Sequence, residues 1–82
     1  MMKKIYFNIL FILVSVCSYA QTDTKAQADS AYINNDFAGA VNLYEQILAN
    51  EGESADIYYN LGNSYYKMDN IAKAIVNYEK AL

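Results

Sequence analysis

Apolar side chains between residues 55 and 68 recur every three or four positions, which is the spacing of one face of an α-helix. They are Ile57, Leu61, Tyr65 and Met68, with Tyr58 and Gly62 beside them. A half-buried strand would instead alternate apolar and polar side chains at every second position. Ser54 is a suitable N-cap, and Asp56 lies in the first turn, where the helix dipole favours a negative charge. The pattern therefore predicts a helix that begins near Ala55.

Two pairs of polar residues interrupt the helical pattern and predict turns. Both Asp69-Asn70 and Asn35-Asp36 tolerate turn conformations, and their side chains compete for nearby backbone hydrogen bonds. A helix should restart near Ile71 after the first pair, and the second pair should act in the same way. The helix before Ser54 is expected to end near Asn50, with residues 51–53 as a linker. Two helical hairpins are therefore predicted.

The two predicted hairpins repeat each other along the sequence, with a period of about 34 residues, and helical repeat proteins have fixed periods of this size. The identical pairs are Ser30 and Ser64, Tyr32 and Tyr66, Ala38 and Ala72, Ala40 and Ala74, Tyr44 and Tyr78, Glu45 and Glu79, and Leu48 and Leu82. The conservative pairs include Val41 with Ile75 and Phe37 with Ile71. An internal repeat of helix pairs is therefore predicted.

The second hairpin carries a recognisable motif. Its sequence Tyr58-x-x-Leu61-Gly62-x-x-Tyr65, followed by Ala74-x-x-x-Tyr78-x-x-Ala81, resembles the tetratricopeptide repeat (TPR), with Tyr58 in place of the usual Trp. The resemblance implies an all-α fold of helix–turn–helix repeats that stack into a right-handed α-solenoid. It places a degenerate first TPR at residues 21–54 and a second TPR, incomplete at its C-terminal end, at residues 55–82.

The resemblance also assigns packing roles within each repeat. Gly62 and Ala74 should let the first helix (helix A) and the second helix (helix B) approach closely, while larger side chains fill the space around them. The structural signature consists of Tyr58, Leu61, Gly62, Tyr65, Ala74, Tyr78 and Ala81 in repeat two, and Ala40 and Tyr44 in repeat one. In repeat one, Thr24, Gln27 and Ala31 stand where bulky residues belong, as expected of a terminal repeat.

Two repeats, the second unfinished, fall short of the three or more that usually share a continuous core. The chain is therefore expected to be a fragment of marginal stability. Its last helix should expose Ile75, Tyr78 and Leu82.

Residues 1–20 have the features of a secretory signal peptide. A basic start at Lys3-Lys4 precedes an apolar run, and Ser18-Tyr19-Ala20 ends it with small outer residues, which predicts cleavage after Ala20. A retained membrane anchor is the first alternative, although a spanning helix needs about 20 apolar residues. The second alternative is a lipoprotein signal acylated at Cys17, for which Val14 and Val16 fit poorly.

Composition narrows the possible functions of residues 21–82. Four lysines against nine acidic residues give a net charge of -5, which would repel a phosphate backbone. The whole chain contains no Arg or His, and Cys17 is its only cysteine. Bidentate phosphate binding, a histidine base and thiolate ligands are thereby excluded from this segment. No catalytic residues, metal or cofactor are predicted; the expected partners are proteins or peptides and not nucleic acid.

Residues 51–67 and 70–75 further resemble the TPR protein of the Bat aerotolerance operon. In that family an exported TPR segment precedes a membrane span and an SH3-like domain, and von Willebrand-type membrane proteins are partners. The resemblance implies scaffolding in a bacterial cell-envelope complex connected with tolerance of oxygen stress, with membrane association through segments beyond Leu82. The alternatives are a TPR lipoprotein subunit of an outer-membrane assembly or secretion machine, and an enzyme whose catalytic domain lies beyond Leu82.

The predicted binding surface is the concave face of the TPR array, lined by helix A residues that are not needed to pack against helix B. We expect it to consist of Lys25, Asp29, Tyr32, Tyr59, Asn63 and Tyr66, with Asn60 and Lys67 at the edge. A carboxylate-clamping TPR would have Lys at Lys25 and Asn at both Asp29 and Asn60, so that Asp29 departs from the pattern and would repel a carboxylate. Asn60 either contacts a peptide or hydrogen-bonds at the repeat junction. The predicted ligand is an extended or helical peptide held by tyrosine faces and asparagine amides.

Overall fold

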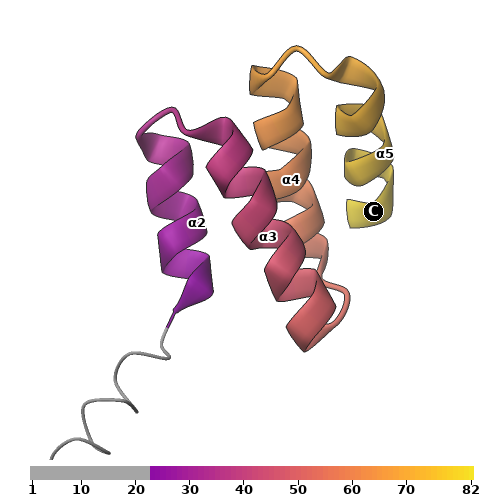
Figure 1. Ribbon diagram of the computed structural model, residues 1–82. Helices are drawn as coiled ribbons and strands as arrows, with labels where there is room; N and C mark the ends of the chain where they lie inside the picture. The colour runs from indigo at the N-terminus through magenta and orange to yellow at the C-terminus, as the bar shows by residue number, and fades with distance from the viewer. Residues whose placement is uncertain (1–22) are drawn as a thin grey trace, which may run out of the picture.

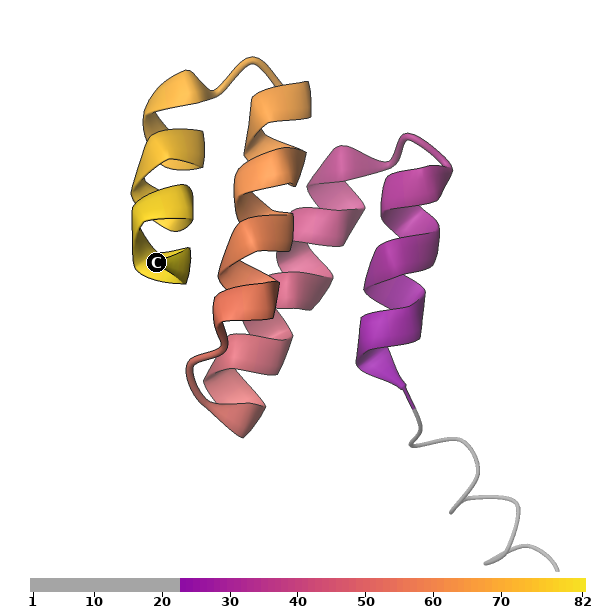
Figure 2. The same ribbon diagram turned by 180° about the vertical axis from the view of Figure 1, so that it is seen from behind.

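The computed structural model describes residues 23–82, which form four α-helices. These are α2 (Thr24–Ile33), α3 (Phe37–Glu51), α4 (Ala55–Lys67) and α5 (Ile71–Ala81). They stand side by side in chain order, and each packs against the next (Figures 1 and 2). The described residues contain no strand, so the predicted all-α class of paired helices is confirmed. The predicted signal peptide, including Cys17, lies outside the described residues.

Each helix begins at a side-chain cap. Asp36 Oδ1 accepts a hydrogen bond from the Gly39 amide at 3.0 Å. The three other helices have N-caps of the same kind, formed by Asp23, Ser54 and Asn70. A cap of this type satisfies an amide that has no partner within the helix, and it stabilises a helix by about 1 kcal/mol. The starts predicted at Ala55 and Ile71 are therefore confirmed.

The turns inside the two hairpins have the same conformation. Asn35 and Asp69, which occupy equivalent positions of the two repeats, both have left-handed backbones, with φ of 65° and 61°. The next amide then reaches back into helix A: Asp36 N donates to Ala31 O at 2.8 Å, and Asn70 N donates to Tyr65 O at 2.9 Å. Asn and Asp tolerate the left-handed region better than most residues, which explains why polar pairs mark both turns.

The core lies between the helices and is built from a few buried side chains. They are Ala28, Ala40, Tyr44, Ile47, Ile57, Leu61, Tyr65 and Ala74. Positions that the repeat equates have equivalent places: Ala40 and Ala74 are both buried between helices A and B. Met68, the last apolar residue of the predicted helical pattern, is the C-cap of α4 and is exposed.

The junction between repeats is a short linker. α3 ends at Glu51, one residue later than expected, and Gly52 follows with φ of 92°, a conformation that side chains rarely adopt. The last helix leaves Ile75 and Leu82 exposed as predicted. Tyr78 was also expected to be exposed, but it is half-buried, because its ring lies over Gly62. Between residues 23 and 82, no helix combines the length and apolar character that crossing a membrane requires.

Candidate peptide-binding face

The predicted concave face is distributed over α2 and α4. Lys25, Asp29 and Tyr32 lie on α2, and the remaining members, Tyr59, Asn60, Asn63 and Tyr66, lie on α4. Lys25 of α2 forms an ion pair with Asp56 of α4, and Tyr59 of α4 packs against Tyr78 of α5.

Two polar members of the concave face are bound to helix B. The Tyr44 hydroxyl donates a hydrogen bond to Asp29 Oδ1, and the Tyr78 hydroxyl donates one to Asn63 Oδ1 at 2.5 Å. The two donors occupy equivalent positions of the repeats, as do the two acceptors, so the same bond joins helices A and B in both repeats. The expectation that these side chains are not needed against helix B is therefore wrong for Asp29 and Asn63. Each satisfies a tyrosine hydroxyl that would otherwise lose its partner.

Two aromatic members of the face also contact helix B. Tyr32 packs edge-on against Phe37 of α3, with ring centroids 5.3 Å apart. Tyr59 packs against Tyr78 of α5, with centroids 5.7 Å apart and the ring planes inclined by 50°. Even so, Tyr59 remains 55% exposed and Tyr66 58% exposed. The α4 helix thus presents two large aromatic side chains, one of them steadied by a neighbouring ring.

Tyr78 of α5 contacts a polar and an aromatic side chain of α4. Its hydroxyl donates to Asn63, and its ring packs against Tyr59. Burial raises the pKa of Tyr78 above the ordinary value, and Tyr59, Tyr32 and Tyr66 raise the pKa further.

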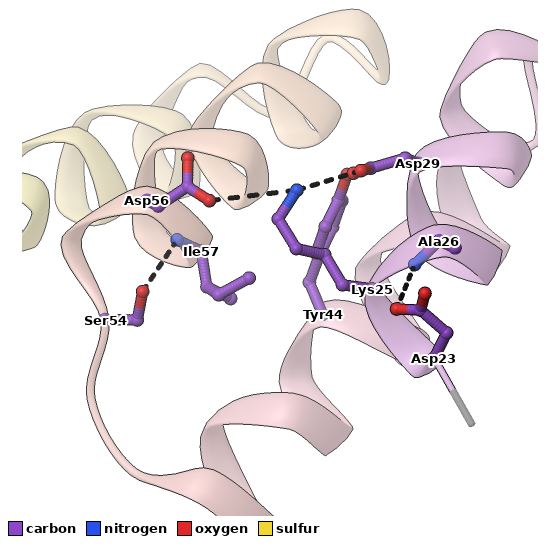
Figure 3. A network of polar contacts seen from close by, with 8 residues as sticks. All are labelled: Asp23, Lys25, Ala26, Asp29, Tyr44, Ser54, Asp56 and Ile57. Atoms are coloured by element: carbon purple, nitrogen blue, oxygen red, sulfur yellow. Dashed lines mark hydrogen bonds and ion pairs between the residues drawn. The ribbon is translucent and has the colours of Figure 1, made fainter. Parts of the chain in front are cut away.

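A network of charges occupies the other end of the face (Figure 3). Lys25 Nζ lies 2.9 Å from Asp29 Oδ2 and 3.8 Å from Asp56 Oδ2, so one ammonium group bridges two carboxylates. The hydrogen bond from Tyr44 lowers the pKa of Asp29, and the bond from Lys25 lowers it further. The bond with Asp29 in turn raises the pKa of Lys25. Burial raises the pKa of Tyr44 strongly, and its bond to Asp29 adds to the rise.

This network bears on the carboxylate-clamp pattern. The lysine that would bind a ligand carboxylate is already paired with two aspartates, and both would repel that carboxylate. Asp56 was predicted only as a first-turn acid and was missed as a member of this face. Its position three residues before Tyr59 was the available signal, because side chains at i and i+3 share a helix face. Asn60 is half-buried on α4, and its contact with a peptide stays a prediction.

An open hollow of about 660 Å³ lies between the start of α4 and the end of α5. Its lining residues are Ala55, Asp56, Tyr59, Tyr78, Ala81 and Leu82. Most of this lining is apolar or aromatic, and Asp56 supplies its charged side chain. The hollow therefore lies between the carboxylate of Asp56 and the rings of Tyr59 and Tyr78.

Tyr58 and Tyr65, the two remaining tyrosines of the TPR signature, each contact one acidic and one basic side chain. The Tyr65 hydroxyl donates to Glu45 Oε1 at 3.0 Å, which ties α4 to α3, and Lys73 lies 5.4 Å from the centre of the Tyr65 ring. Tyr58 is arranged similarly, between Glu53 and Lys80. These contacts connect neighbouring helices and are structural. Within residues 23–82, no three acidic, cysteine or histidine side chains are grouped as a metal site would require.

Comparison with known proteins identifies the second hairpin. Residues 55–82 match the family model described as the tetratricopeptide repeat. The chain is also similar to the protein SGT1 homolog of Oryza sativa subsp. japonica, with 27% identity over 63 residues. That alignment covers 77% of this chain but only 17% of the relative's length. No solved structure matches the chain. The comparisons thus support a TPR, but they do not show the resemblance to the Bat operon protein.

Proposed function

We propose that this chain is a protein-binding scaffold that holds a peptide segment of its partner against the concave face. The observation that carries the proposal is the pair of tyrosines on α4, Tyr59 and Tyr66, which are more than half exposed although they stand on a packed helix. Rigid aromatic side chains lose little conformational freedom on binding and bury a large area, so they commonly dominate interface energies. Stacked helical repeats use surfaces of this kind for binding.

The proposal is tested by removing the two rings. A Tyr59→Ala/Tyr66→Ala variant should keep its helical circular dichroism but lose partner capture from a membrane extract. Ile75→Ala/Val76→Ala is a suitable control, because these α5 side chains are exposed to a similar degree, 52% and 48%. Undiminished capture by a folded tyrosine variant would overturn the assignment of the concave face.

We further propose that the scaffold is exported and acts in a bacterial cell-envelope complex connected with oxygen-stress tolerance. The basic and apolar pattern of residues 1–20 supports export, and the resemblance to the Bat operon protein supports the envelope role. A mature N-terminus at Gln21, determined by mass spectrometry of the exported product, is the expected result. An acylated N-terminus at Cys17 would instead favour the alternative, a TPR lipoprotein subunit of an outer-membrane assembly or secretion machine.

A further inference from the structure

We infer that the segment bound on the concave face is basic, and that an arginine side chain of the partner enters the hollow beside Asp56. This inference rests on the proposed function and specifies the chemistry of the partner. It is carried by three features: the charge left over in the Lys25 network, the aromatic and apolar lining of the hollow, and the acidity of the described residues.

The Lys25 network leaves one negative charge without compensation. Lys25 lies closer to Asp29, at 2.9 Å, than to Asp56, at 3.8 Å, and Asp29 also accepts the Tyr44 hydroxyl. The Asp56 side chain is 66% exposed. An exposed ion pair at this distance contributes little stability, so the carboxylate can pair with an incoming cation at small cost. Asp56 is thus the carboxylate of the network that is open to a ligand.

The lining of the hollow suits the rest of an arginine side chain. Ala81 and Leu82 offer apolar surface to its methylene groups, and the partly exposed ring of Tyr59 offers a face to the planar guanidinium. Arginine also forms paired hydrogen bonds with a carboxylate, which an ammonium group cannot match geometrically. The chain already uses related contacts internally, since Lys73 lies over the Tyr65 ring and Lys80 over the Tyr58 ring.

Charge complementarity decides between possible occupants. Residues 23–82 carry four lysines and nine acidic residues, a net charge of -5, and the one lysine of the Asp29–Asp56 network is already paired. An acidic segment or a terminal carboxylate would meet two aspartates. A neutral apolar segment would expel the water around Asp56 and leave it only the long ion pair with Lys25. A basic segment has neither disadvantage, and the negative field also accelerates its association.

Three fluorescent peptides of one shared sequence test the inference. The same four positions carry arginine, its neutral isostere citrulline, or glutamate. Binding to the full chain is measured by fluorescence anisotropy at physiological salt. The arginine peptide should bind about tenfold more tightly than the citrulline peptide, and the glutamate peptide should bind most weakly.

Two matched substitutions locate the effect. Asp56→Asn should lower the affinity for the arginine peptide to about that for the citrulline peptide, whose own affinity should not change. Asp69→Asn removes the same charge about 20 Å away along α4, and Asn tolerates the left-handed backbone at that position, so the affinity should stay within about twofold of wild type. Circular dichroism verifies that both variants are folded.

The possible outcomes separate the inference from the proposed function. No detectable binding of the arginine peptide, equal binding of the arginine and citrulline peptides, or equal losses in Asp56→Asn and Asp69→Asn would overturn the basic partner. If the citrulline peptide binds as tightly as the arginine peptide and Tyr59→Ala/Tyr66→Ala abolishes both, the concave face remains the binding surface with a different ligand. If the tyrosine variant binds every peptide as wild type does, the proposed binding face fails as well.

Discussion

Replacing Gly62 by alanine tests how closely the helices of repeat two approach each other. A β-carbon at this position would lie 2.5 Å from both Cδ1 and Cε1 of Tyr78. Carbon atoms prefer separations of about 3.5–4.0 Å, so the ring must move back by roughly 1 Å. Its bond to Asn63 and its contact with Tyr59 oppose that movement, and each contributes about 1 kcal/mol.

Two opposing effects set the change in the free energy of unfolding of Gly62→Ala. Alanine in place of glycine in a helix interior stabilises by about 1 kcal/mol, whereas overpacking typically costs about 1–3 kcal/mol. We expect a net loss of about 1 kcal/mol, which for a domain of this size lowers Tm by about 4–8 °C. Thermal and urea unfolding followed by circular dichroism measure the change. With Tyr78→Leu the obstacle is removed, so Gly62→Ala should then stabilise the protein by about 1 kcal/mol.

A Gly62→Ala variant that is as stable as wild type, or more stable, would have a clear structural explanation. Repeat one has alanine at the equivalent position, Ala28, which is fully buried near Tyr44. If repeat two can relax to the same spacing, Gly62→Ala will retain only the gain in helix propensity. If Gly62→Ala leaves Tm unchanged or raises it while Tyr78 is kept, the close contact at Gly62 is refuted.

Three further predictions concern stability and use the same unfolding measurements. Asp29→Ala should lower the free energy of unfolding by about 1–3 kcal/mol, because it leaves the buried Tyr44 hydroxyl without an acceptor. Asp29→Asn should cost less, since Asn63 accepts the equivalent bond in repeat two. Equal losses in the two variants would contradict this role of Asp29. The folded state lowers the pKa of Asp29, so the stability that its carboxylate contributes is present above the unfolded pKa of about 3.9 and is lost as pH falls through the folded value. The difference in urea midpoint between wild type and Asp29→Asn should therefore shrink as the pH falls over that range. A constant difference would count against this role of the carboxylate. Ala74→Leu should overpack the contact between helices A and B and cost about 1–3 kcal/mol, and an unchanged midpoint would show that the contact is loose.

The local features of the fold could be predicted from the sequence because short-range chemistry determines them. Ser54 and Asn70 cap helices through their own side chains, and Asn35 and Asp69 accept left-handed turns. The internal repeat then placed Ala74 in the core of repeat two, as Ala40 is in repeat one.

Which side chains of the candidate binding face are free to contact a partner could not be predicted in the same way. Whether Asp29 and Asn63 are free depends on where the hydroxyls of Tyr44 and Tyr78 reach across a neighbouring helix, and helix spacing sets that reach. The pairing of Lys25 with Asp56 depends likewise on the distance between two repeats. Neither distance is encoded in the periodicity of one helix.

Photo-cross-linking from single positions tests the binding role of the concave face most directly. A benzophenone amino acid is incorporated in place of Tyr66 on α4, or in place of Ile75 on α5 as a control of similar exposure. Each protein is produced in full in cells and irradiated, and the products are identified by mass spectrometry. The proposed function predicts one partner cross-linked from position 66, in a single short segment, and none from position 75. Cross-linking of the partner from position 75 alone would contradict it, because the partner would then lie on α5 and away from the tyrosines.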